Sequence, residues 1–337
     1  MKAALISDVG KIDVVEMEAP KPNNGELLIR VKACALCTHE QRVFNGVTHP
    51  NLPYLAGHEI SGVVEGLGDN VVGKWEIGDR VVVRTLNSCM VCDNCRSGNN
   101  NMCLNADSAI DPRTAGLAQY ICLPEFQVFR IPDYVPFSQG ALTEPLACCV
   151  HSVSQCDINF GDDVVVVGAG IMGCFHTQLC KLKGARVIVV EPDAERREIA
   201  KSVGADVTID PTNSDQADEV RKLTDGLGAD FVFNTVAFPE SIPNAVQLLK
   251  AGGSLMLFSG VYPNTPVEFA FGQIHNKEFK VLGSFSSESV DFTRAVKLQK
   301  NKQIEIEKFI YKVFPLAEAQ KAFESTRGAY RVVIDME

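Results

Sequence analysis

The stretch that decides the fold is residues 163–191, DVVVVGAGIMGCFHTQLCKLKGARVIVVE. Four valines lead into a Gly-x-Gly-x-x-Gly pattern at residues 168–173, and a helical pattern follows. A second apolar run, Arg186–Val190, then ends in Glu191. This order predicts a strand, a tight glycine turn, a helix and a parallel strand, which is the arrangement that binds a dinucleotide.

Each residue of this turn has its own expected role. Gly168 permits the turn, Gly170 lets the backbone approach a pyrophosphate, and Gly173 lets helix and strand pack closely. Ile171 and Met172 open the helix, whose first N–H groups face the phosphates. The alternative is a tight turn that binds no ligand.

The acidic residue after the second strand bears on the choice of cofactor. A carboxylate at Glu191 accepts hydrogen bonds from the adenosine ribose and repels a 2′-phosphate, so NAD is predicted rather than NADP. Arg196 and Arg197 follow and could bind such a phosphate. The simpler interpretation, which we favour, is two solvated charges on the next helix.

The surrounding sequence predicts an α/β protein with two domains. Strand and helix patterns alternate from Asp163 to about residue 286, including helices at Ile171–Lys183 and Ile242–Leu249, which predicts a parallel sheet covered on both faces. Residues 1–145 contain short β-branched runs between turns, with little room for crossover helices, which favours an antiparallel barrel. We place the domains at 1–145 and 146–286, followed by a mixed segment at 287–337.

Composition excludes several classes of protein. The chain has 337 residues, 46% of them apolar, and a net charge of -10, which argues against a nucleic-acid partner. It lacks an apolar run of membrane-spanning length. The charged start of the sequence is unlike a signal peptide, so a cytoplasmic location is expected.

Four of the twelve cysteines follow a metal-binding pattern. Cys89, Cys92, Cys95 and Cys103 are spaced C-x2-C-x2-C-x7-C on a loop at residues 87–105. Four thiolates suit a closed, structural zinc site, although an iron–sulfur cluster accepts the same ligands. A disulfide pair conflicts with the expected compartment.

A second set of donors lies outside this loop. Cys37, His58 and a carboxylate at Glu59 or Glu144 supply a thiolate, an imidazole and an oxygen ligand. Three protein ligands leave a position for water or substrate, which is typical of a catalytic zinc. Spacing alone does not establish this site, because a buried Cys, a hydrogen-bonded His and a surface Glu are each common.

In their order along the chain, these motifs resemble the zinc-dependent medium-chain alcohol dehydrogenase family, over essentially the whole sequence. Glu144, where ethanol-type enzymes have a third cysteine, is similar to the polyol branch typified by sorbitol dehydrogenase. The resemblance implies a chaperonin-10-like β-barrel catalytic domain, a Rossmann domain and an active cleft between them. It also implies a homodimer or homotetramer.

The resemblance also implies roles for individual residues. Cys37 and His58 are zinc ligands, Glu59 or Glu144 is the third, and Glu40 holds the ligand histidine. Where the family has Ser or Thr two residues after the cysteine, this chain has His39, with Thr38 one place earlier. His39 therefore either relays the substrate proton or only shapes the pocket.

Further cofactor contacts follow from family position. They are Val236, Ser259, Val261 and Ser284, in loops after later strands, and Arg331, a basic residue that reaches the pyrophosphate. The alternatives are ordinary strand-to-helix turns and a surface arginine.

Together these features predict an NAD-dependent enzyme with two zinc ions per chain, one catalytic and one structural. It would interconvert a secondary alcohol and a ketone, the alcohol being a polyol or sugar derivative. Alternatives are a zinc dehydrogenase of an amino alcohol, sugar acid or aldehyde, and a non-catalytic NAD-binding member of the family.

Overall fold

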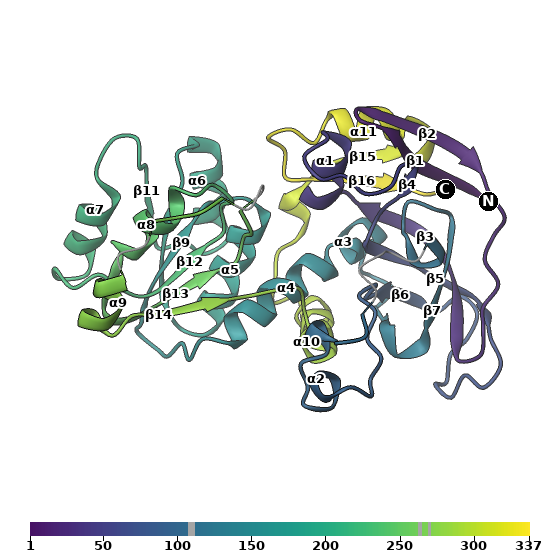
Figure 1. Ribbon diagram of the computed structural model, residues 1–337, viewed down its shortest axis with the longest axis horizontal. Coiled ribbons are helices and arrows are strands. Elements are labelled where there is room, and N and C mark those ends of the chain that lie inside the picture. Colours follow the sequence, from purple (N-terminus) through teal and green to yellow (C-terminus); the bar gives the residue numbers. More distant parts are fainter. Residues whose placement is uncertain (107–111, 262–264, 269–270) are drawn as a thin grey trace. The chain divides into compact units, whose positions relative to one another are not determined.

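The computed structural model describes residues 1–106, 112–261, 265–268 and 271–337, and it divides into two compact units (Figure 1). Unit 1 comprises Met1–Ala147 and Ser287–Glu337, and unit 2 comprises Cys148–Ser286. The chain thus leaves the first unit, forms the second and returns. The boundary falls within helix α4 (Thr143–Ser154).

Unit 1 is built mainly from antiparallel strands. A small sheet has the order β2-β1-β4, and a larger one the order β15-β16-β3-β5-β6-β8, with β7 also paired to β3. Only β15 and β16 pair in parallel among these described strands. The strands are β1 Lys2–Asp8, β2 Lys11–Glu16, β3 Glu26–Ala35, β4 Tyr54–Leu55, β5 Glu59–Leu67, β6 Arg80–Val83, β7 Tyr120–Pro124, β8 Val128–Arg130, β15 Ile310–Pro315 and β16 Arg331–Asp335.

Alternating side chains explain these strands. In β3, Leu27, Ile29 and Val31 are buried, whereas the residues between them are partly exposed. A strand points successive side chains to opposite faces, so one face of β3 packs in the core. Phe314 and Ile334, from the end of the chain, belong to the same core. The helices of this unit are α1 Thr38–Phe44, α2 Asp93–Arg96, α3 Phe137–Ala141, α10 Ser289–Lys300 and α11 Ala319–Glu324.

Unit 2 contains the predicted parallel sheet, with strand order β11-β10-β9-β12-β13-β14. Val164, Val165 and Val166 of β9 lie at its centre and are buried. The order reverses direction at β9, as in a doubly wound fold. The strands are β9 Asp163–Val167, β10 Arg186–Val190, β11 Val207–Ile209, β12 Ala229–Asn234, β13 Leu249–Leu257 and β14 Lys280–Gly283. The helices are α5 Ile171–Leu182, α6 Ala194–Ser202, α7 Gln216–Leu223, α8 Ser241–Val246 and α9 Phe271–Lys277.

One predicted element is wrong in its extent. The helix expected at Ile242–Leu249 ends at Val246, and strand β13 begins at Leu249. Leu249 pairs with Ala229 of β12 and is buried in the core. Long-range strand pairing therefore overrides the local helical pattern at this point. Within the described ranges, no helix has the length and apolar character needed to cross a membrane.

Candidate active site and cofactor site

Strand register in unit 1 brings three distant segments together. Ala35 of β3 pairs with Glu59 at the start of β5 and, on the other side, with Val333 of β16. Cys37, just beyond the end of β3, therefore lies beside the segment before β5 and the first residue of β16, Arg331. Figure 1 shows β16 in yellow among strands from the start of the chain, in purple and blue. This sheet end is where the expected catalytic donors meet.

The donor atoms of Cys37, His58 and Glu59 lie within 4.8 Å of one another. The group offers one thiol, one imidazole and one carboxylate, a donor set that fits Zn²⁺. Cys37 and His58 are partly exposed, whereas Glu59 is fully buried. Open faces on two of the three donors leave room for a substrate oxygen.

Glu40 ties the two donor segments to each other. Its buried carboxylate accepts hydrogen bonds from the backbone N–H of Cys37 (3.0 Å) and of Gly57 (3.3 Å). It also lies 2.8 Å from Nδ1 of His58. Because Glu40 occupies Nδ1, the other ring nitrogen, Nε2, is the one left for a metal.

Glu40 and His58 shift each other's pKa. Burial lowers the pKa of His58, but the charges of Glu40 and Cys37 outweigh it and raise that pKa well above its usual value. Burial likewise raises the pKa of Glu40, and the nearby His58 overcomes this and lowers it. A carboxylate and an imidazole held in this way form a tight pair.

Gly57, which precedes His58, is required by the backbone. Its φ is +101°, and a Cβ there would lie 2.8 Å from Cys34 Sγ and 2.8 Å from the backbone nitrogen of Leu117. A side chain would therefore displace the segment that carries His58.

Arg331 forms a buried ion pair with Glu59. Nη2 and Nε of Arg331 donate to the two carboxylate oxygens at 2.7 and 3.0 Å, and Nη2 lies 3.7 Å from Cys37 Sγ. Burial raises the pKa of Glu59, with Arg331 acting in the opposite direction and Glu144 adding to the rise. The resemblance placed Arg331 at the cofactor pyrophosphate, but the residue is only 5% exposed and its guanidinium engages Glu59. No pattern in the sequence indicates this pair, because its members are separated by most of the chain.

Glu144 lies in the first turn of α4, outside the group of three donors but close enough to influence Glu59 electrostatically. Both carboxylates named from the sequence thus belong to one neighbourhood. The structure groups Glu59, rather than Glu144, most closely with Cys37 and His58.

His39 and Thr38 open helix α1 directly after Cys37, and both are exposed. The ring of His39 lies 6.2 Å from that of His58, and its Nε2 lies 3.4 Å from the hydroxyl of Tyr54. Loss of hydration at its ring, as the largest influence, lowers the pKa of His39, and the charge of Glu40 acts in the opposite direction. Sequence reasoning did not single out Tyr54, although it stands only four residues before His58.

The four-cysteine lobe brings its thiols together as expected. The sulfur atoms of Cys89, Cys92, Cys95 and Cys103 lie within 4.8 Å of one another. All twelve cysteines of the chain are free thiols. Hydrogen bonds from the backbone N–H groups of Val91 and Cys92 lower the pKa of Cys89 to about 6. Four converging sulfurs fit a tetrahedral metal site with no position left for substrate.

In unit 2, the predicted glycine turn joins strand β9 to helix α5. Gly168 has a φ of +96°, and a Cβ there would come within 2.7 Å of Val236. A Cβ on Gly173 would lie 1.9 Å from the carbonyl oxygen of Gly168, so helix α5 approaches the turn closely. A Cβ on Gly170 would meet nothing within 4 Å. That space lies at the N-terminus of α5, whose first residues are Ile171 and Met172.

Glu191 stabilises this turn through hydrogen bonds to the backbone. Its buried carboxylate accepts hydrogen bonds from the N–H groups of Ala169 (2.7 Å) and Asp193 (3.0 Å). Arg197 donates to backbone carbonyls of Glu191 and Pro192 and pairs with Asp210.

Arg196 is partly buried. Its backbone N–H donates to the carboxylate of Asp193, which caps helix α6. The remaining predicted contacts follow the ends of strands in this sheet. Ser259 donates to the carbonyl of Thr235, the residue before Val236. Val261 is partly exposed. The buried hydroxyl of Ser284 has no hydrogen-bond partner among the described residues.

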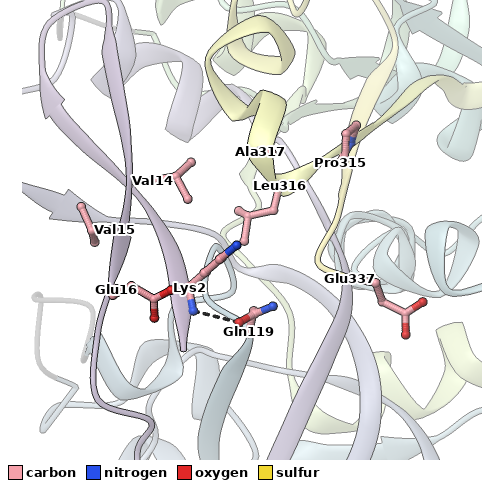
Figure 2. A pocket seen from close by; sticks show the side chains of 9 residues that line it. All are labelled: Lys2, Val14, Val15, Glu16, Gln119, Pro315, Leu316, Ala317 and Glu337. Carbon is pink, nitrogen blue, oxygen red and sulfur yellow. Dashed lines mark hydrogen bonds between the residues drawn. The ribbon is translucent and has the colours of Figure 1, made fainter.

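A separate hollow in unit 1, of about 340 Å³, lies between β2 and the end of β15 (Figure 2). Lys2, Glu16, Gln119 and Glu337 contribute its polar groups, and the N–H of Lys2 donates to Gln119. The hollow shares no residue with the donor groups and contains no cysteine or histidine. It therefore lies apart from the donor groups described above.

The chain is similar to known proteins over most of its length. Residues 23–133 match the alcohol dehydrogenase GroES-like domain, and residues 172–301 match the zinc-binding dehydrogenase domain. D-arabitol-phosphate dehydrogenase of Enterococcus avium is 30% identical over 328 residues, which cover 96% of this chain and 93% of that protein. The chain belongs to the zinc-dependent alcohol dehydrogenase family. The family resemblance inferred from the sequence, and with it an oxidoreductase using zinc and a nicotinamide cofactor, is confirmed.

Other members of the family cover the chain just as fully. Sorbitol dehydrogenase of Halalkalibacterium halodurans is 30% identical over 328 residues, 96% of this chain and 95% of that protein. A zinc-binding dehydrogenase from Sinorhizobium meliloti, solved with NADP bound, is 31% identical and covers 99% of each chain with a TM-score of 0.90. The barrel and Rossmann fold class expected from the sequence is therefore confirmed.

Proposed function

We propose that this chain catalyses the reversible oxidation of a secondary alcohol, a polyol or sugar derivative, with NAD as hydride acceptor. The observation that carries the proposal is the group of Cys37, His58 and Glu59, whose thiol, imidazole and carboxylate converge without filling a tetrahedral site. Two similar proteins, by name, act on sorbitol and on D-arabitol phosphate. An oxygen ligand also leaves zinc more willing to accept extra oxygen donors than a third thiolate would.

In this proposal Cys37, His58 and Glu59 hold the catalytic zinc, with Glu144 in its surroundings. Zinc, when bound, lowers the pKa of a substrate hydroxyl, and NAD supplies the hydride acceptor. Glu40 fixes the orientation of His58. His39 and Thr38 stand beside Cys37, where a proton released by the substrate can pass to solvent. A structural zinc occupies the four-cysteine lobe.

The cofactor site in this proposal is the glycine turn of unit 2. The N–H groups at Gly170, Ile171 and Met172 receive the pyrophosphate. The carboxylate of Glu191 disfavours the extra phosphate of NADP. The proposed contacts from Val236, Ser259, Val261 and Ser284 are not needed for this choice.

The same enzyme is proposed to form a homo-oligomer in the cytoplasm. Strand β14 is the last in its sheet. Val281 within this strand is 40% exposed, and Phe285 just beyond its end is 62% exposed. Helix α9 has no buried residue among those described. An edge strand with exposed apolar side chains suits pairing with a second copy. The free thiols fit a reducing compartment.

The test combines metal analysis with an activity panel. Purified protein is assayed for zinc per chain and for NADH formation from sorbitol, xylitol, D-arabitol and simple alcohols, and from an amino alcohol, a sugar acid and an aldehyde. Two zinc ions per chain and faster oxidation of polyols than of primary alcohols support the proposal. Turnover confined to an amino alcohol, a sugar acid or an aldehyde would replace the substrate class, and NAD binding without any turnover would indicate a non-catalytic member.

A further inference from the structure

Two polar side chains that are not themselves zinc donors lie beside the candidate zinc donors. The ring of His39 and the phenol of Tyr54 meet edge to face, with centroids 6.4 Å apart and planes at 73°. His39 follows Cys37 at the start of α1, and Tyr54 precedes His58 in β4. Each therefore belongs to one of the two segments that carry donors.

Their direct contact is weak. The 3.4 Å between Nε2 of His39 and the oxygen of Tyr54 exceeds the usual length of a hydrogen bond between such groups. A phenol both donates and accepts, and a neutral imidazole nitrogen does one or the other. The pair can therefore exchange this long contact for two shorter ones to a single hydroxyl group.

Backbone pairing holds the phenol in place. Tyr54 pairs with Ile6 of β1, and the next residue, Leu55, is 7% exposed. The phenol itself is partly buried, and this burial, followed by the nearby charge of Glu40, raises its pKa to about 12. It stays protonated at neutral pH and remains a hydrogen-bond donor.

We propose that Tyr54 and His39 together bind a second hydroxyl of the substrate, next to the one that reacts, and so select polyols over simple alcohols. The inference rests on the proposed function and adds a specificity-determining residue to it. The ring of His39 lies 6.2 Å from the ring of the candidate ligand His58. A substrate whose reacting hydroxyl lies at the zinc donors would therefore carry a neighbouring hydroxyl towards this ring.

The test uses Tyr54→Phe, which removes only the phenol oxygen. Two small alcohols that differ by one hydroxyl, 2,3-butanediol and 2-butanol, are compared for kcat/KM. We expect Tyr54→Phe to lower kcat/KM for the diol about 3- to 10-fold, the effect of one lost hydrogen bond, and to leave 2-butanol unchanged. Tyr311→Phe, at a 62% exposed tyrosine of β15, is the matched control and should change neither value.

A second variant tests whether the two residues act as a pair. If His39 and Tyr54 share one hydroxyl, their effects should not add. Tyr54→Phe should then reduce the preference for the diol less in the His39→Gln background than in the wild-type protein. Zinc content and thermal unfolding, measured for each variant, separate this contact from a loss of structure.

The outcomes distinguish this inference from the proposed function. Wild-type protein that forms no NADH from these alcohols or from sorbitol, xylitol and D-arabitol would overturn the function itself. Active wild-type protein whose Tyr54→Phe variant loses equally on both alcohols, or on neither, would overturn only the hydroxyl contact.

Discussion

The two groups of candidate metal donors are assembled in different ways. The four-cysteine lobe takes its thiols from one short loop, residues 89–103, so the chain reaches all four by local turns. The group at Cys37, His58 and Glu59 depends on the register of β3 with β5, and its partner Arg331 comes from β16 near the end of the chain. A local site needs only correct spacing, whereas a sheet-end site needs the whole of unit 1 to fold.

The largest expected effect separates the two groups by function. Cys37→Ser should lower kcat/KM by about 10³-fold or more and remove one of two zinc ions, because substrate activation needs the metal. The matched Cys92→Ser should remove the other zinc and lower the midpoint of thermal unfolding. Steady-state kinetics and elemental analysis measure both. Equal loss of activity in the two variants, under conditions where both remain folded, would remove the distinction.

Glu40 gives the next test, since it joins segments that only the fold brings together. Glu40→Gln keeps the shape but removes the charge that pairs with His58, so zinc affinity or kcat/KM should fall about 10- to 100-fold. Competition with a chelator measures the affinity. Glu76→Gln, at an exposed carboxylate of the same unit, is the control. Unchanged affinity in Glu40→Gln would mean that sheet register alone positions His58.

A buried histidine in unit 2 sharpens the contrast with His58. His176 lies on α5 with no facing carboxylate among its hydrogen-bond partners, the carbonyl of Met172 and the hydroxyl of Ser152. Burial lowers its pKa to about 4, from 6.5, the ordinary value that the unfolded chain retains. Its contribution to stability is therefore fully present above pH 6.5 and is lost as the pH falls towards 4.

The expected size of this loss is about 2 kcal/mol between pH 7 and pH 5. Urea unfolding, followed at both values for the wild type and His176→Gln, measures it. The variant should lose less stability over that interval. An identical pH dependence in the two proteins would show that His176 does not carry the effect.

The smallest effect concerns the cofactor turn. Glu191→Gln keeps an acceptor for the N–H of Ala169 but removes the charge that disfavours a 2′-phosphate. The preference for NAD over NADP, as a ratio of kcat/KM values, should fall about tenfold. Glu195→Gln, exposed on α6, serves as the control. A preference for NADP in the wild-type protein would contradict the assignment of Glu191.

Some features could be predicted because they depend on neighbours in sequence. The glycine turn, the alternating strands and helices of unit 2 and the cysteine lobe each reflect short-range geometry, which spacing records directly. The helix predicted at Ile242–Leu249 is longer than the observed one, because Leu249 pairs with Ala229, twenty residues earlier in the chain. Local sequence does not record such a distant partner.

Residue types, their spacing and the family resemblance can be recognised from the sequence alone. The pairing of Arg331 with Glu59, the position of Glu40 between two donor segments, and the contact of Tyr54 with His39 become visible only in the folded chain. These contacts join separate segments of the chain, and strand pairing rather than local conformation brings those segments together. A hydrogen bond or ion pair forms only where both partners are brought within reach, and in unit 1 the sheet register does this.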